Sequence, residues 1–289
     1  MNNETKGMIY GLLGVTAFGL TLPATRIVVP FMDPIFIGLG RAIIAAMCAI
    51  LILFFFRQKL PSFRQIKKLL IVAMGVVVGF PVLASWAMQY VPASHGGVVL
   101  GILPLITSIC AVIIANEKPS IAFWVVSIVG STLVVLYAVL QGAGSLHIAD
   151  IALLGAILSA AIGYAVGAEL SKEMGGWQVI CWALVVSIPF ITIPAALNMP
   201  SSFSDISMHA YISFLYLALF SQLFGFFLWY KGLALGGIAR VSQTQLLQPF
   251  ITFLASVLFL GERIDLYTII FIVLVAGIVW FGRTLAIKR

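Results

Sequence analysis

One long apolar stretch of the sequence, 238–260, carries a row of polar side chains whose spacing could build a solute-binding wall. Its members recur every three or four residues and so share one face of a helix: Ser242, Gln245, Pro249, Thr252 and Ser256. Gln248 lies beside this face. Pro249 cannot donate to the carbonyl of Gln245, so a backbone acceptor is freed and needs a partner. The row indicates either a polar wall of a substrate path or hydrogen bonds between helices.

Other apolar stretches carry aromatic and amide side chains that could complete such a wall. Phe18 and Tyr164 accompany glycine-rich helix faces and could project from a crowded seam into a central space. Gln222 lies near the middle of its stretch, where an unpaired amide is unfavourable, so it must face protein or water. Trp86 and Trp229 could be gates or members of an interfacial aromatic belt, and the belt is favoured for Trp229. The candidate solute-binding side chains are Phe18, Trp86, Tyr164, Gln222, Trp229, Gln245 and Gln248.

Three ionisable side chains, Arg41, His95 and Glu169, could have a charge or coupling role. The acidic residues all lie at or near the ends of apolar stretches, and Glu169 comes nearest to mid-membrane depth. Lys172 beside Glu169 favours a plain surface pair. A histidine titrates near neutral pH, although an interfacial histidine is the commoner reading of His95. Arg41 lies about two turns inside a membrane boundary, and it either reaches back to Asp33 or attracts an anionic group.

The elements that position these residues are expected to be membrane helices. The chain of 289 residues is 62% hydrophobic and 9% charged, with a mean hydropathy of +1.17. A soluble domain carries about 25% charged residues, so lipid must be the solvent. The apolar runs are continuous rather than alternating, which indicates helices. The expected spans are 7–28, 34–56, 66–90, 93–115, 120–141, 148–170, 177–197, 208–232, 238–260 and 265–286.

The basic residues predict the orientation of these ten spans. With the N-terminus in the cytoplasm, 13 Lys and Arg residues fall on the inner side and 2 on the outer side. This bias follows the positive-inside rule and predicts cytoplasmic ends for a multi-pass protein of the cytoplasmic membrane. The net charge of +7 therefore reflects membrane topology rather than nucleic-acid binding.

The sequence repeats its own pattern after 145 residues. Pro104 and Glu117 in the stretch 93–117 correspond to Pro249 and Glu262 in the stretch 238–262. Two units, 1–144 and 145–289, are expected. With five spans each, an odd number, the units would be inverted repeats that hold a substrate near the membrane midplane. The two glutamates are expected to clasp the next helix.

These features resemble the paired EamA repeats of the drug/metabolite transporter (DMT) superfamily. The resemblance rests on the two proline-containing helices that end in Asn116-Glu117 and Gly261-Glu262, on the small-residue helices GLLGVTAFG and GAILSAAIGYAVG, and on Arg41. It covers essentially the whole chain. It implies an all-α membrane protein of ten helices in two inverted five-helix repeats, and a permease for amino acids, nucleobases, drugs or other metabolites.

The leading function is a secondary transporter that exports an amino acid or similar amphipathic compound by alternating access. A pocket of amides, hydroxyls and rings without a buried charge suits a neutral, zwitterionic or weakly cationic solute. The alternatives are an uptake carrier or exchanger for an organic cation, nucleobase or other metabolite, a passive pore, and an intramembrane transferase. The sequence has no G-x-x-x-x-G-K-[ST] loop for ATP.

No catalytic residue, metal ligand or cofactor is assigned. The three cysteines lie inside expected spans and are not spaced like metal ligands. An outer metal site built from His147, His209, Asp150 and Asp205 is conceivable, but nothing in the spacing demands it. The expected partners are a small-molecule substrate and the lipid bilayer, in a monomer or a homodimer.

Overall fold

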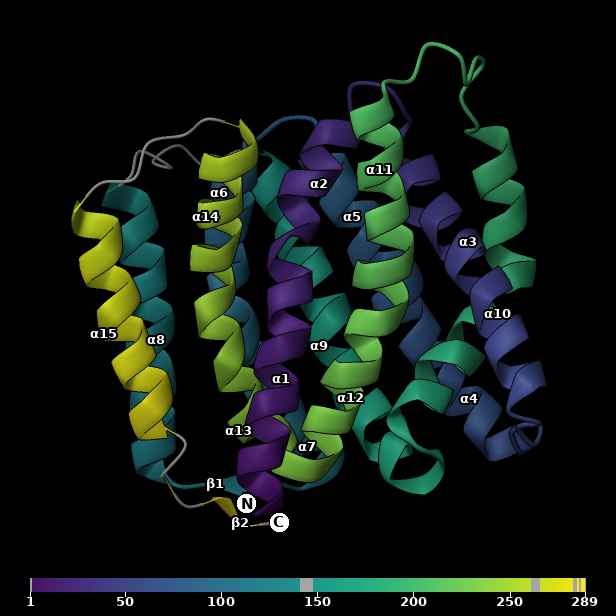
Figure 1. The fold of residues 1–289 in the computed structure, drawn as a ribbon. Helices are drawn as coiled ribbons and strands as arrows, with labels where there is room; N and C mark the ends of the chain where they lie inside the picture. Colours follow the sequence, from purple (N-terminus) through teal and green to yellow (C-terminus); the bar gives the residue numbers. More distant parts are fainter. Residues whose placement is uncertain (1, 141–147, 261–265, 283–284, 286, 289) are drawn as a thin grey trace.

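The computed structural model describes residues 2–140, 148–260, 266–282, 285 and 287–288, which form an almost entirely helical bundle (Figure 1). The helices of the first half are α1 (Asn3–Gly19), α2 (Thr21–Val28), α3 (Pro34–Phe55), α4 (Phe63–Val72), α5 (Phe80–Ala87), α6 (Ala93–Val99), α7 (Leu103–Ala115) and α8 (Ile121–Leu140). Those of the second half are α9 (Ile148–Met174), α10 (Gly176–Leu197), α11 (Met208–Tyr216), α12 (Gly225–Gly236), α13 (Ile238–Ser242), α14 (Gln248–Leu260) and α15 (Leu266–Gly282).

Seven helical segments of the described chain are long and apolar enough to cross a membrane. They are Asn3–Val28, Pro34–Phe55, Phe63–Ala87, Ala93–Ala115, Ile148–Met174, Gly176–Leu197 and Met208–Gly236. Two shorter apolar helices lie within α8 and α15, at Ile121–Leu136 and Val273–Gly282. The all-helical membrane class is thus confirmed, while the count of ten spans stays a prediction.

Three of these segments, and the stretch from α13 to α14, contain irregular turns that fall at corresponding places in the two halves. The π-helices η1 (Ala73–Gly79) and η3 (Leu217–Phe224) join α4 to α5 and α11 to α12. The 3₁₀ turns η2 (Leu100–Ile102) and η4 (Gln243–Leu247) precede Pro104 and Pro249. Each proline lacks an N–H, so the turn before it cannot complete its α-helical bonds. π-Helices occur frequently at functional sites.

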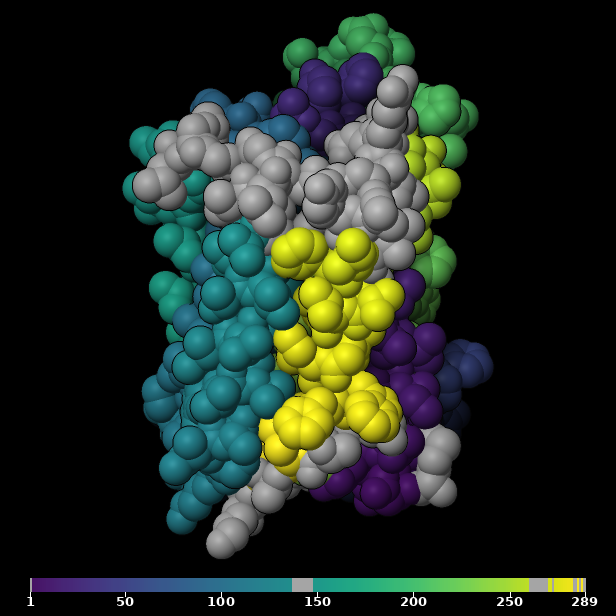
Figure 2. Space-filling model, turned by 90° about the vertical axis from the view of Figure 1, so that its left-hand side faces the viewer, coloured from purple at the N-terminus to yellow at the C-terminus, as the bar shows by residue number. Residues whose placement is uncertain are grey.

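Matched helices of the two halves pack as antiparallel neighbours. The stretch with Pro249 starts with α13, which packs against α7, and ends with α14, which packs against α6. Since α6 precedes α7 in the chain, the two stretches run in opposite directions. α3 also packs against α10, with Phe56 after the end of α3 beside Trp177 at the start of α10. α8 and α15 lie side by side on one flank (Figure 2).

Glycines let two pairs of helices approach closely around the centre of the bundle. α1 packs on α12, and a Cβ added to Gly7 would lie 2.4 Å from the Cα of Gly236. α9 packs on η1, and a Cβ at Gly75 would lie 2.6 Å from the carbonyl oxygen of Ser159. Such distances leave no room for a side chain, so backbones supply both contacts.

The surface of the bundle is apolar and its interior is partly polar, the reverse of a soluble protein. Phe54 and Ile121 are 83% and 85% exposed, whereas Gln222 and Ser108 are fully buried. This surface suits a lipid environment. Both termini lie at one end of the bundle, next to the short strands β1 (Lys118–Pro119) and β2 (Ile287–Lys288), which pair with each other (Figure 1).

Candidate functional site

A small cavity lies at the centre of the bundle, where helices of both halves meet. Its lining residues are Phe18, Thr21, Arg41, Val76, Phe80, Tyr164, Ser221, Phe226 and Gln248. The cavity is small, with a volume of about 10 Å³. The cavity therefore holds about one water molecule. A larger solute requires the lining helices to move apart.

Arg41 brings a buried positive charge to this cavity. Its Nε and Nη2 atoms donate to the Oε1 atom of Gln222, at 3.1 and 2.8 Å. The Nε2 atom of Gln222 donates in turn to the carbonyl oxygen of Val76, at 3.0 Å. The expected alternative, in which Arg41 reaches back to Asp33, is wrong. The carboxylate of Asp33 instead caps α3 by accepting from the N–H of Ile35.

The carbonyl of Val76 is available because of the π-helix and a proline. The N–H of Phe80 bonds to the carbonyl of Gly75, five residues back, rather than to Val76. The next residue, Pro81, has no N–H to offer. The free carbonyl of Val76 then fixes the orientation of the Gln222 amide, which leaves the amide oxygen to hold Arg41.

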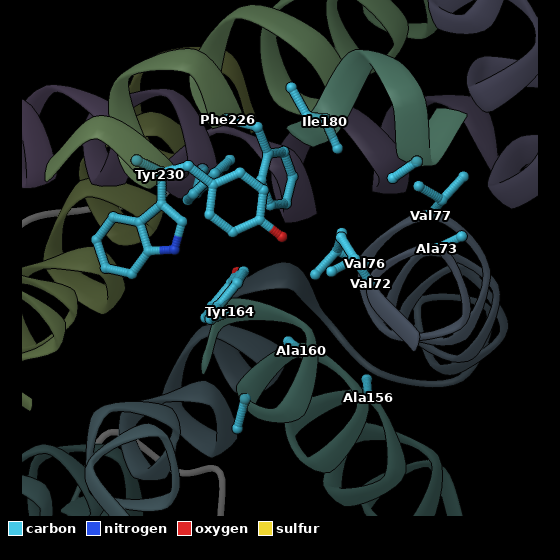
Figure 3. Packing of buried hydrophobic residues seen from close by; sticks show 14 of the residues in the cluster. Val72, Ala73, Val76, Val77, Ala156, Ala160, Tyr164, Ile180, Phe226 and Tyr230 are labelled. Carbon is cyan, nitrogen blue, oxygen red and sulfur yellow. The ribbon is translucent and has the colours of Figure 1, made fainter. Parts of the chain in front are cut away.

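Hydroxyl groups and aromatic rings complete the walls. The hydroxyls of Thr21 and Ser221 are hydrogen-bonded at 2.8 Å. The ring of Phe18 stacks on that of Tyr164, with centroids 6.4 Å apart, and lies 4.9 Å from that of Phe226. Tyr164, Phe226 and Tyr230 gather in the buried core around Val76 (Figure 3). The site thus combines one cation, hydroxyls and amides with an aromatic wall.

The structure brings four of the candidate solute-binding residues to this cavity. Phe18, Tyr164 and Gln248 line it, and Gln222 holds Arg41 beside it. Sequence reasoning missed Thr21, Ser221, Phe80 and Phe226 as lining residues. The available signal was a pair of hydroxyl residues, Thr21 and Ser221, deep inside apolar stretches.

Two tryptophan candidates lie in different surroundings. Trp229 is fully buried against Phe18 and Tyr164, so its placement in an interfacial belt is wrong. The close approach of α12 to α1 encloses it. Trp86 is only partly buried, its ring lies 4.7 Å from that of Tyr90, and it is not among the residues that line the cavity.

Gln245 is buried, and within the described part of the chain neither its oxygen nor its nitrogen has a hydrogen-bond partner. It does not line the cavity in this structure. Its neighbours in the polar row join helices: Thr252 donates to the carbonyl of Gly19 at 2.7 Å, and the hydroxyls of Ser242 and Ser108 lie 3.3 Å apart.

The two other ionisable candidates lie away from the cavity. Glu169 pairs with Lys172, as the adjacent charges suggested. His95, at the start of α6, is buried, and its Nε2 atom lies 2.6 Å from a carboxylate oxygen of Asp150 in α9. This contact joins the fourth and sixth stretches.

We expected Glu117 to bind the next helix, but this prediction is wrong. It binds a helix of the other half instead. Its carboxylate accepts from the N–H groups of Ile238 at 2.8 Å and Ala239 at 2.9 Å, at the start of α13. A carboxylate is unfavourable at the end of its own helix but favourable at the start of another. The equivalent Glu262 lies outside the described residues.

The described residues contain no group of three His, Cys, Asp or Glu side chains placed to hold a metal ion. His147, a member of the conceivable outer metal site, lies outside those residues.

Comparisons with known proteins agree with the repeat and the membrane fold. The EamA-like transporter family matches twice, at residues 5–139 and 147–282. YdeK of Bacillus subtilis (strain 168), named an uncharacterized transporter, is 45% identical over 264 residues, which are 91% of this chain and 92% of YdeK. YyaM of the same organism, also named an uncharacterized transporter, is 23% identical over 273 residues, 91% of this chain and 89% of YyaM.

A solved crystal structure shares the fold. It aligns with a TM-score of 0.77 over 97% of this chain and 99% of its own, at 14% sequence identity. The expectation of a transporter rather than an enzyme is confirmed by the family and by the named relatives. Because the family matches both halves, the chain belongs to the EamA-like transporter family, and it is a membrane transporter of the DMT superfamily.

Proposed function

We propose that this chain is a secondary transporter that moves a small amphipathic metabolite by alternating access, with export of an amino acid or a similar compound as the leading case. Ten spans in two inverted five-helix repeats would surround the solute, and both termini would face the cytoplasm. The observation that carries the proposal is the small polar and aromatic cavity lined by both halves.

Two features of the helices support inverted repeats. The matched stretches with Pro104 and Pro249 are antiparallel neighbours, as a twofold axis in the membrane plane requires. The π-helices and the 3₁₀ turns also recur in both halves. Irregular backbone inside a membrane bundle is tolerated where protein or a cavity satisfies it. Such turns are places where a helix can bend while the bundle opens.

The small volume of the cavity, which is about that of one water molecule, favours a carrier over a pore. A pore keeps a continuous path, whereas a carrier passes through states in which its site is sealed. The basic residues near the end of the bundle that holds both termini support a cytoplasmic position for that end.

Counterflow in proteoliposomes tests this function. Vesicles with purified protein are loaded with unlabelled L-phenylalanine, L-leucine or L-glutamine, and entry of the same labelled amino acid is followed. A carrier for such a compound predicts saturable entry that internal solute accelerates, relative to protein-free vesicles. Entry that rises linearly with concentration and ignores internal solute would contradict alternating access. Inside-out vesicles, which accumulate an exported solute, distinguish export from uptake.

A further inference from the structure

Arg41 is a buried cation whose hydrogen bonds are incomplete. The side chain is 2% exposed, and its only hydrogen bonds within the described residues are the two to the Oε1 atom of Gln222. A guanidinium has five donors, so three are left for another acceptor. None of the carboxylates in the described chain forms an ion pair with it. A charge at membrane depth is costly and generally marks a solute or ion pathway.

Gln222 holds this cation without neutralising it. Its amide is fixed at both ends, by Arg41 at the oxygen and by the Val76 carbonyl at the nitrogen. Gln222 therefore fixes the position of the guanidinium but leaves its positive charge available to a solute. This arrangement differs from a structural ion pair, in which a carboxylate would occupy the guanidinium.

The surroundings of Arg41 define what would satisfy it. One guanidinium with spare donors matches a single carboxylate, which it can bind through two parallel bonds. Thr21, Ser221 and Gln248 offer further polar contacts, and Phe18 and Phe226 offer apolar surface. The cavity lining contains no carboxylate that would bind an ammonium group. The expectation of a pocket without a buried charge is wrong, because Arg41 is buried and lines the cavity.

We propose that the transported solute is an organic monocarboxylate with an aromatic or apolar body, that Arg41 is its counter-charge, and that an ammonium group is not needed for binding. This inference rests on the proposed function and narrows its substrate class. The carboxylate would take the spare donors of Arg41, and the body would lie against the aromatic wall once the cavity widens. Gln222 is a positioning residue in this arrangement.

Four compounds that share a 3-phenylpropyl skeleton test whether binding requires a carboxylate. The four probes are 3-phenylpropionate, L-phenylalanine, 3-phenylpropionamide and 3-phenylpropylamine, with thermal shift and calorimetry on the purified chain in lipid nanodiscs. We expect 3-phenylpropionate to bind at least as tightly as L-phenylalanine, and both to bind at least about tenfold more tightly than the amide or the amine. Preference for the amine, or binding of L-phenylalanine without binding of 3-phenylpropionate, would overturn the proposal.

Three variants test whether Arg41 causes the preference for the carboxylate. Arg41→Gln should abolish the preference for 3-phenylpropionate over its amide, and Arg41→Lys should keep part of it. Arg64→Gln, at an exposed arginine, is the matched control and should bind like the parent. Unchanged selectivity in Arg41→Gln would contradict the role of Arg41.

Gln222→Glu covers the case in which Arg41→Gln does not fold. A carboxylate at this position keeps the contact with Arg41 but occupies the guanidinium from within the protein. We expect this variant to fold and to lose 3-phenylpropionate binding by at least about tenfold. Undiminished binding of 3-phenylpropionate would contradict the role of Arg41 as its counter-charge.

The experiments distinguish failure of the carboxylate proposal from failure of the proposed transport function. If counterflow of an uncharged or cationic solute persisted in Arg41→Gln, the chain would still be a carrier, but the carboxylate proposal would be contradicted. If the parent chain bound the carboxylate but showed no counterflow, the proposed binding site would stand and the proposed carrier function would be contradicted.

Discussion

At the scale of single residues, the centre of the molecule is organised by polar groups that are satisfied to different degrees. Gln222 uses both ends of its amide, and the hydroxyls of Thr21 and Ser221 satisfy each other. Arg41 keeps spare donors, and Gln245 has no partner among the described residues. A buried group without a partner is destabilising, so its presence suggests a partner in another state.

Replacing Gln245 with Leu tests that idea. The substitution removes an unsatisfied amide, so the midpoint of thermal unfolding should stay the same or rise. Transport should fall if the amide meets the solute or a new helix partner when the cavity opens. Flux in proteoliposomes and the unfolding midpoint are measured together, with the exposed Gln89→Leu as control. Parental flux would remove Gln245 from the pathway.

At the scale of elements, the two halves are joined by contacts between helix ends and between glycine faces. The carboxylate of Glu117 connects the end of α7 to the start of α13 and satisfies two backbone donors that no helical bond can reach. A helix cap of this kind contributes about 0.5–2 kcal/mol. The clasp therefore fixes the ends of the two proline-containing stretches relative to each other.

Glu117→Gln should weaken this clasp. The glutamine side chain keeps one acceptor but directs an N–H toward one of the two backbone donors, so one buried bond is lost. We expect a destabilisation of about 1–2 kcal/mol, seen as a lower unfolding midpoint in detergent. Glu169→Gln is the matched control, since that carboxylate forms only a surface pair with Lys172. Equal midpoints in the two variants would argue against the cap.

Gly7→Ala tests the contact between α1 and α12. The added Cβ would lie 2.4 Å from the Cα and the nitrogen of Gly236, so the helices must separate. We expect a lower unfolding midpoint and slower flux, because α1 also carries Phe18 to the cavity wall. Gly277→Ala is the control, since nothing lies within 4 Å of a Cβ added there. A variant as stable as this control would show that the seam is not rigid.

The sequence was enough to predict the helical membrane class and the resemblance between the halves, because both depend on apolar runs and on the 145-residue offset. It also selected Phe18 and Tyr164, which accompany glycine-rich helix faces, and Gln222 and Gln248, which are amides within apolar stretches. It could not predict that Glu117 caps α13, because that contact spans 121 positions of the chain. Nor could it show that Pro81 and a π-helix free the carbonyl that orients Gln222.

At the scale of the whole molecule, a small cavity lined by helices of both halves is the central feature. Gln248 lines that cavity from α14, together with Arg41 of the first half and Tyr164 of the second. If the halves rock against each other, this one position should meet water from each side of the membrane in turn.

The most direct test is the accessibility of a cysteine placed at Gln248. Cys48, Cys110 and Cys181 are first replaced by Ala, and a membrane-impermeant thiol reagent is then added to right-side-out or inside-out vesicles. Ser62→Cys and Ser201→Cys, at exposed positions near opposite ends of the bundle, report one side each. The account predicts that Gln248→Cys reacts from both sides, whereas each control reacts from one. Reaction from one side only, or from neither while the controls react, would contradict alternating access.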